Sequence, residues 1–163
     1  MIVTQETALI EGSLRENIDI RLEDKSRDAE IDRILFNLGF SNSNYLKSGL
    51  DMQIDADGSN LSAGEKQLIS FARTLLDQKK IMILDEATAN IDLKTEEKIQ
   101  KCIDQDFKNT TMLIIAHRIQ TIMNCDRILV LEKGRIAALD TPANLSAQSD
   151  SYFTNIINKM KES

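Results

Sequence analysis

A continuous apolar run at residues 81–84 ends in two adjacent acids, Asp85 and Glu86. An uninterrupted apolar segment of this length is typical of a strand that is buried on both faces of a parallel sheet. A helix is predicted from Asp92, with a second apolar strand at residues 112–116 after it. Strands that alternate with helices in this way predict a doubly wound α/β fold, whose ligands bind at the carboxyl ends of the strands.

The rest of the chain extends this pattern. Apolar residues at helical spacing predict one helix from Asp28 to the stop at Gly39 and another from Ser62. Residues 41–60 are rich in Ser, Asn, Asp and Gly and are predicted to be a loop. The remaining expectations are a strand end at residues 1–3, strands at 128–131 and 135–139 joined by a turn at Lys133 and Gly134, and helix starts at Arg118 and at Thr141-Pro142.

Composition excludes several classes of partner. With 163 residues, the chain is long enough for one domain with a sizeable core. The net charge of -6 and the aromatic content of 4% provide neither a basic surface for phosphate backbones nor platforms for base stacking. We therefore expect no nucleic-acid partner. No segment approaches the roughly 20 apolar residues of a membrane span, so membrane association would need other polypeptide.

The run LSAGEKQL at residues 61–68 contains the S-x-x-E pattern of a capping box. Ser62 is expected to accept the amide of Glu65, and the Glu65 carboxylate to reach back to Ser62. Such a helix N-terminus, with Gly64 allowing close approach to the backbone, also suits an anion. The structural and the functional interpretation of this run can both hold.

Four polar residues at strand and helix ends allow both a structural and a functional interpretation. Asp85 and Glu86 either mark only the end of a strand or point toward the ligand-binding edge of the sheet. His117, the single histidine, is either structural or part of the same sheet edge. Asp92 caps a helix whatever its other role.

Three runs in this order, LSAGEKQL at 61–68, IMILDEATANID at 81–92 and LIIAHR at 113–118, resemble the signature helix, the Walker B strand with its D-loop, and the switch histidine of the ATP-binding cassette (ABC) ATPases. The resemblance implies a P-loop NTPase-like α/β fold, with a parallel sheet and a helical signature subdomain. The phosphate-cradling pattern G-x-x-x-x-G-K-[ST] is absent from the chain, so the fold is expected to lack the Walker A strand and loop.

The resemblance also implies a domain organisation. The whole chain, 1–163, would be part of one nucleotide-binding domain. Residues 1–78 would hold the Q-loop, the helical subdomain and the signature helix. Residues 79–163 would hold Walker B, the D-loop, the switch histidine and the C-terminal part of the core. In related domains the Walker A strand lies between the strands that correspond to 112–116 and 128–131, so these two are expected to lose a neighbour.

Residue roles at the catalytic edge follow from the same resemblance. Glu86 would polarise the attacking water as general base, and His117 would contact the γ-phosphate of ATP and orient that water. Asp85 would help to hold Mg²⁺. Gln5 stands in a run similar to the Q-loop, IVTQETALIEGSLRENID, and would reach the same metal ion.

A second set of residues would bind ATP held by the opposite nucleotide-binding domain. This set is Ser62, Ala63, Gly64 and Glu65 of the signature, with Asp92 of the D-loop. The signature departs from the consensus LSGGQ at Ala63 and Glu65. A carboxylate about 6 Å from a phosphate charge, at an effective dielectric constant of about 20, costs roughly 2 to 3 kcal/mol before screening. Glu65→Gln is therefore expected to tighten nucleotide-dependent closure.

The chain is most similar to the second nucleotide-binding domain of a C-subfamily exporter. The implied function is ATP binding and hydrolysis coupled to export, with a second nucleotide-binding domain and transmembrane domains as partners, at the cytoplasmic face of a membrane. The segment itself would be soluble. The isolated chain is expected to be inactive, because it lacks the loop that holds the β- and γ-phosphates. The alternative is a non-enzymatic module that supplies its signature in trans to a complete nucleotide-binding domain.

Overall fold

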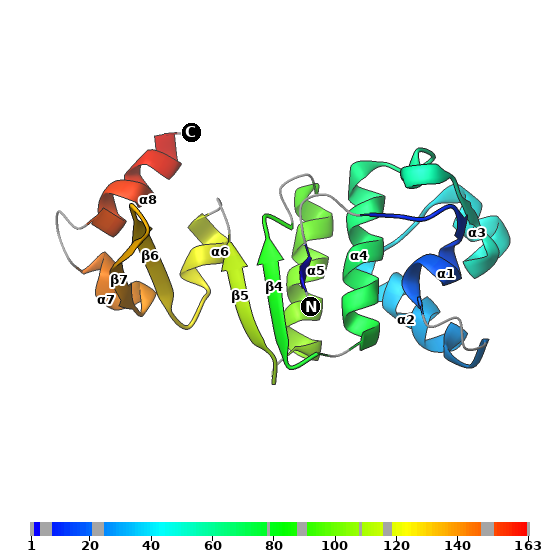
Figure 1. Ribbon diagram of the computed structural model, residues 1–163, viewed down its shortest axis with the longest axis horizontal. Helices are drawn as coiled ribbons and strands as arrows, with labels where there is room; N and C mark the ends of the chain where they lie inside the picture. Colours follow the sequence, from blue (N-terminus) through cyan, green and yellow to red (C-terminus); the bar gives the residue numbers. More distant parts are fainter. Residues whose placement is uncertain are drawn as a thin grey trace. The chain divides into compact units, whose positions relative to one another are not determined.

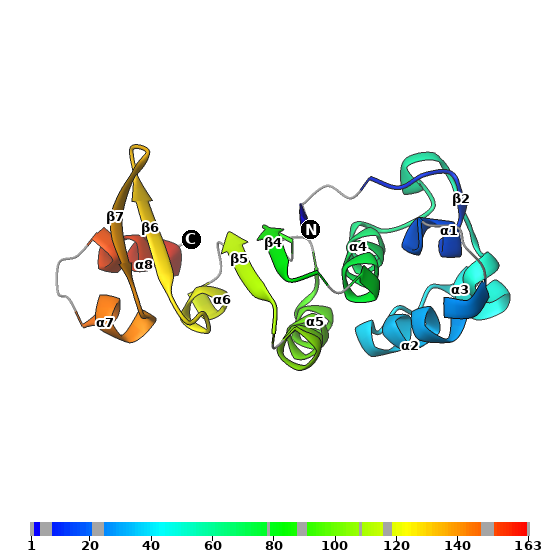
Figure 2. The same ribbon diagram turned by 60° about the horizontal axis from the view of Figure 1, so that its bottom comes forward.

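The computed structural model describes residues 2–3, 8–20, 25–77, 79–87, 91–107, 109–115, 119–147 and 152–162. The chain forms two compact units, Met1–Leu113 and Ile114–Ser163. The elements of the first unit are β1 (Ile2–Val3), β2 (Gly12–Ser13), α1 (Leu14–Ile18), α2 (Asp28–Leu38), α3 (Ser43–Ser48), β3 (Gln53–Ile54), α4 (Ala63–Asp77), β4 (Ile81–Asp85) and α5 (Leu93–Asp106), with 3-10 turns at Lys25–Arg27, Gly49–Asp51 and Ala56–Gly58. Figures 1 and 2 label these helices and strands, apart from β1 and β3. Strand β5 (Thr111–Ile115) crosses the division between the units.

A three-stranded sheet in the order β1-β4-β5 carries the candidate catalytic edge. Strand β1 runs parallel to β4, with Ile2 opposite Ile83. This arrangement confirms the predicted α/β class with a parallel sheet. Met82 and Leu84 are buried, but Ile81 is 61% exposed, so the expectation of burial along the whole strand is wrong at its first residue. Strand β5 is at the end of the sheet order, and its Leu113 and Ile115 are about half exposed.

Helices α2 and α4 pack against each other and form the helical part of the first unit (Figure 1). Both confirm their predicted positions. Helix α2 ends at Gly39, which has the left-handed φ of 74° that glycine adopts without steric cost. The apolar stripe of α4 that the sequence indicates is buried, and it consists of Leu68, Phe71, Ala72 and Leu75.

The prediction of a loop over residues 41–60 is wrong. This segment contains α3, two 3-10 turns and β3, which pairs antiparallel with β2. Asn42 caps α3, because its side chain accepts a hydrogen bond from the amide of Asn44. The ring of Tyr45 on this helix meets Phe40 edge-on, with centroids 5.4 Å apart. These elements are too short to show the periodicity from which longer helices are predicted.

The second unit is a hairpin with helices beside it. Its elements are α6 (Ile119–Met123), β6 (Ile128–Glu132), β7 (Arg135–Asp140), α7 (Pro142–Ser146) and α8 (Tyr152–Glu162). Strands β6 and β7 pair antiparallel around the predicted turn, and Thr141 caps α7 with proline in its first turn as predicted. The described helices include none that is long and apolar enough to span a membrane.

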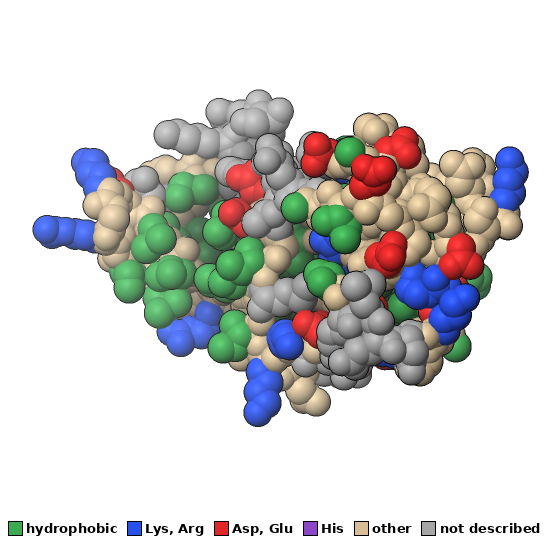
Figure 3. Space-filling model, turned by 45° about the vertical axis from the view of Figure 1, so that its right-hand side comes forward, with side chains coloured by type: hydrophobic (Ala, Val, Ile, Leu, Met, Phe, Trp, Pro, Cys, Tyr) green, Lys and Arg blue, Asp and Glu red, His purple; other side chains and the backbone are tan. Residues whose placement is uncertain are grey.

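The two faces of the hairpin differ. Ile128 and Val130 of one face pack with Leu145 and Phe153 in a small apolar core. The other face exposes Leu129, Leu131, Ile136 and Leu139. Exposed apolar side chains are visible toward the left of Figure 3, the side on which Figure 1 draws the hairpin. The second unit thus leaves one side of its hairpin uncovered by the residues that the structure describes.

Candidate functional site

The start of α4 is a complete capping box. The Ser62 hydroxyl oxygen accepts the Glu65 amide at 3.2 Å. In return, Oε2 of Glu65 accepts the Ser62 amide at 2.8 Å and the Ser62 hydroxyl at 2.7 Å. The predicted reciprocal capping is therefore confirmed, and it fixes the conformation of the candidate signature without any ligand.

The second carboxylate oxygen of Glu65 has a partner that the sequence did not indicate. Nδ2 of Asn42 donates to Oε1 of Glu65 at 2.6 Å. Partial burial of Glu65 raises the pKa of its carboxyl, but the hydrogen bonds from Ser62 and Asn42 lower it, and the net pKa lies below its ordinary value. Glu65 is therefore a carboxylate at neutral pH, with its charge directed into this network. Its predicted repulsion of a phosphate stays a prediction.

Gly64 lies in the first turn of α4. Beyond its own helix turn, a Cβ added to it would meet no atom of the described residues within 4 Å. Glycine inside a helix is roughly 0.5 to 1 kcal/mol less favourable than alanine, so the fold alone would be better served by alanine here. Ala63 beside it is exposed. The backbone at this helix end is therefore open to an approaching group.

The carboxyl end of β4 places two acids in succession. Asp85 is the last residue of the strand, and Glu86 follows it with a left-handed φ of 50°. For a residue with a Cβ this conformation is unfavourable by roughly 1 to 2 kcal/mol. Asp57 and Lys133 share this conformation in turns, so what distinguishes Glu86 is that its strained backbone stands at the carboxyl end of a parallel strand, where ligands bind. Both acids are half-buried.

These acids suit a nucleotide-bound Mg²⁺. The described residues contain no group of three or more His, Cys, Asp or Glu side chains placed to hold a metal ion. Magnesium in nucleotide sites needs only one or two carboxylates, because phosphate oxygens and water complete its shell, and Asp85 can provide one. Gln5, the other predicted metal ligand, and the predicted catalytic His117 lie outside the described residues.

Asp92 confirms its predicted structural role. Its Oδ1 accepts the amide of Thr95 at 3.1 Å and caps α5. Asn90, which precedes it in the predicted D-loop, lies outside the described residues. A contact of this segment with a partner domain stays a prediction.

Two residues that the sequence analysis did not single out connect the segment after Gln5 to α4. Asn17 is fully buried; its Oδ1 accepts the Ile10 amide at 3.0 Å, and its Nδ2 donates to the carbonyl of Ile10 at 2.9 Å. Arg73 of α4 donates to the backbone carbonyls of Asn17 and Ala8. Burial lowers the pKa of the Arg73 guanidinium. The only sequence signal was a charged residue within the apolar stretch of α4.

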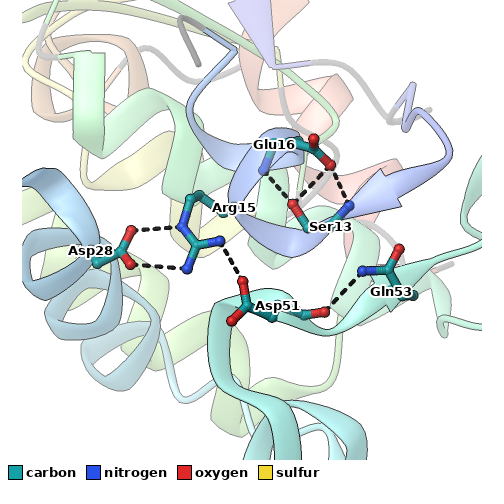
Figure 4. A network of polar contacts seen from close by, with 6 residues as sticks. All are labelled: Ser13, Arg15, Glu16, Asp28, Asp51 and Gln53. Carbon is teal, nitrogen blue, oxygen red and sulfur yellow. Dashed lines mark hydrogen bonds and ion pairs between the residues drawn. The ribbon is translucent and has the colours of Figure 1, made fainter. Parts of the chain in front are cut away.

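A second arginine braces the helical part of the first unit, as Figure 4 shows. Arg15 of α1 forms a bidentate pair with Asp28 at the start of α2, at 2.8 and 2.9 Å. Its remaining nitrogen donates to Asp51 at 2.6 Å, and this bond lowers the pKa of the Asp51 carboxyl. Ser13 and Glu16 form a second capping box beside it. Arg15 thus connects α1 with α2 and with the 3-10 turn at Gly49–Asp51, and these three elements all precede the signature.

Comparison with known proteins identifies a family. The ABC transporter family matches residues 1–89. An oligomycin resistance ATP-dependent permease of Saccharomyces cerevisiae is 39% identical over 97% of this chain and 12% of its own length. ATP-binding cassette sub-family C member 10 of Mus musculus is 38% identical over 99% of this chain and 11% of its own length. The chain therefore spans about a tenth of the length of these relatives.

A solved structure agrees with these sequence relatives. A bacterial Atm1-family ABC exporter, determined with ATP bound, aligns with 97% of this chain at a TM-score of 0.84 and 31% sequence identity. The alignment covers 27% of that exporter chain.

Proposed function

Because the chain belongs to the ABC transporter family and is part of its ATP-binding domain, we propose that it takes part in ATP hydrolysis coupled to export across a membrane. The observation that carries the proposal is a strained acid at a strand end: Glu86 is held left-handed directly after Asp85, at the carboxyl end of a parallel strand. Ligands of open α/β sheets bind at this edge.

Each acid has a separate task in this proposal. Asp85, fixed by β4, helps to hold Mg²⁺, which neutralises phosphate charge. Glu86 accepts a proton from the attacking water as general base. His117 would orient that water and Gln5 would contact the metal ion.

The signature end of α4 serves a different ATP. Ser62, Ala63 and Gly64 would face a nucleotide bound to a second nucleotide-binding domain. The exposed helix N-terminus offers backbone amides and the positive end of the helix dipole to its phosphates. The open space at Gly64 supports this role, because no contact with the described residues requires a glycine there. Asp92 would stand in the loop that meets the same partner.

The complete protein would contain transmembrane domains and act at the cytoplasmic face of the membrane, with this chain on the aqueous side. The isolated chain would bind nucleotide poorly and would not hydrolyse it, since it contains no G-x-x-x-x-G-K-[ST] loop.

The proposal is tested in the full-length protein with Glu86→Gln. Loss of a general base is expected to reduce ATP turnover by about 10²-fold or more, while binding of MgATP is retained. Glu97→Gln, an identical substitution on the exposed face of α5, is the matched control and should leave turnover unchanged. Turnover that survives Glu86→Gln would contradict the proposal and favour a non-enzymatic module that supplies only its signature.

A further inference from the structure

Asn42 makes two hydrogen bonds that connect α3 to the candidate signature. Its Oδ1 accepts the amide of Asn44 at 2.8 Å and caps α3. Its Nδ2 donates to Oε1 of Glu65 at 2.6 Å, across 23 positions of sequence. Because one end of the amide must accept and the other must donate, these two bonds together fix its orientation.

The hydrogen bond from Asn42 matters to Glu65 because Ser62 must stop donating to Glu65 before it can donate to a phosphate. In the structure the Ser62 hydroxyl gives its only hydrogen to Oε2 of Glu65, at 2.7 Å. A serine hydroxyl has one donor, so Ser62 can donate to a phosphate only by turning away from Glu65. The carboxylate would then keep two donors, the Ser62 amide and Asn42.

Without Asn42, the same rotation of the Ser62 hydroxyl would leave the Glu65 carboxylate, among the described residues, with a single donor: the Ser62 amide on Oε2. A half-buried carboxylate with unmet acceptor capacity retains its neighbouring hydroxyl more strongly, since bonds to charged acceptors are the strong ones. It is also free to swing toward the helix N-terminus, where its charge would compete with an incoming phosphate. Asn42 therefore bears on both the position of the Glu65 charge and the release of Ser62.

We propose that Asn42 is a positioning residue of the signature half-site: it holds the Glu65 carboxylate against α3, and so frees Ser62 and Gly64 to receive the γ-phosphate of a nucleotide bound in trans. The inference rests on the proposed role of Ser62 and Gly64. It explains how a signature with an acid in place of the consensus glutamine receives an anion, and it makes Asn42 and Glu65 one functional pair.

The first test is Asn42→Asp in the full-length protein. Aspartate caps helices as well as asparagine does, so α3 keeps its start. The substitution removes the donor and places a second carboxylate opposite Glu65. The KM for MgATP is expected to rise about tenfold, because the charge-assisted hydrogen bond is lost and the added charge repels Glu65, with little change in kcat. A purely structural role would lower the amount of folded protein and leave the KM of the remainder unchanged.

The second test exchanges the two groups. In the double variant Asn42→Asp with Glu65→Gln, the carboxylate and the amide change places, so that the hydrogen bond re-forms with reversed polarity. The negative charge then lies on α3 instead of α4. The KM should return to the wild-type value or fall below it. Failure of the double variant to recover KM would overturn the inference.

Two further variants separate the effect of an added negative charge from the effect of losing the hydrogen bond to Glu65. Asn44→Asp, exposed on α3, adds the same charge two positions away and should leave KM within twofold of wild type. Asn42→Ser keeps a capping hydroxyl, adds no charge and is too short to reach Glu65, and it should raise KM about threefold. A wild-type KM in both Asn42 variants would contradict the proposal.

Gly64→Ala, measured in parallel, distinguishes this inference from the function on which it rests. If Gly64→Ala leaves the KM for MgATP unchanged, the signature half-site itself is refuted. If Gly64→Ala raises KM while Asn42→Asp and Asn42→Ser do not, the half-site stands and only the role of Asn42 is refuted.

Discussion

The start of α4 and the end of β4 are built by different means. At the start of α4, the Ser62 and Glu65 side chains satisfy each other through short hydrogen bonds, and Asn42 adds a third donor. At the end of β4, Glu86 is in an unfavourable backbone conformation. Side-chain hydrogen bonds therefore hold the start of α4, whereas the end of β4 is unfavourable locally and follows a strand that is paired in the sheet.

The signature end of α4 and the proposed catalytic end of β4 therefore depend on different parts of the fold. The signature end is held by Ser62 and Glu65 and by Asn42 at the start of α3, so a partner domain would meet a preformed surface. The proposed catalytic acids follow a strand that pairs with β1, so their placement is expected to depend on that pairing. Substitutions that loosen the helical part of the first unit should therefore disturb the signature, and those that relieve backbone strain should act at Glu86.

The largest effect on stability is expected for Asn17→Ala. The substitution removes a fully buried amide, leaving the backbone amide of Ile10 without its acceptor and Arg73 with fewer acceptors. Loss of a buried, fully bonded polar group lowers the free energy of unfolding by about 3 kcal/mol. Urea denaturation of the chain measures this change. Asn44→Ala, exposed on α3, is the matched control and should stay within about 0.5 kcal/mol of wild type.

Most of these elements could be predicted from sequence, because long helices have clear periodicity and the buried strands are continuous apolar runs. The box at Ser62 and Glu65 follows from residue types three positions apart and was confirmed. Asn42 could not be predicted as its partner, since that contact depends on how residues 23 positions apart come together in the fold. Asn17 was equally hidden, because an asparagine in a polar run gives no sign that it will be buried.

The left-handed conformation at Glu86 predicts a smaller effect. Glu86→Ala and Glu86→Gly both remove the carboxylate, but only glycine relieves the unfavourable φ. The glycine variant should be more stable than the alanine variant by about 1 kcal/mol, the reverse of the order expected in a regular strand or helix. Thermal or urea unfolding of the two variants measures the difference. Greater stability of the alanine variant would show that the conformation is not strained.

The smallest effect concerns acid pH. The folded-state pKa of Glu65 lies below its ordinary value of 4.5, so its carboxylate stabilises the fold above that value. This contribution is lost as the pH falls through the lower, folded-state pKa. Glu65→Gln should therefore lose less stability than wild type between about pH 6 and about pH 3. Urea midpoints across this range test it, with Glu97→Gln as the matched control, and equal losses in wild type and Glu65→Gln would contradict it.

Gly64→Ala tests the signature end of α4 most directly, because its two measurable effects should have opposite signs. Alanine has room in the fold and is the better helix former, so the free energy of unfolding should rise by about 0.5 to 1 kcal/mol. The added methyl group would obstruct a phosphate approaching the backbone, so the KM for MgATP of the full-length protein should rise about tenfold, as expected for the loss of about 1.4 kcal/mol of binding free energy. A more stable protein with an unchanged KM would contradict the role of this helix end in binding nucleotide.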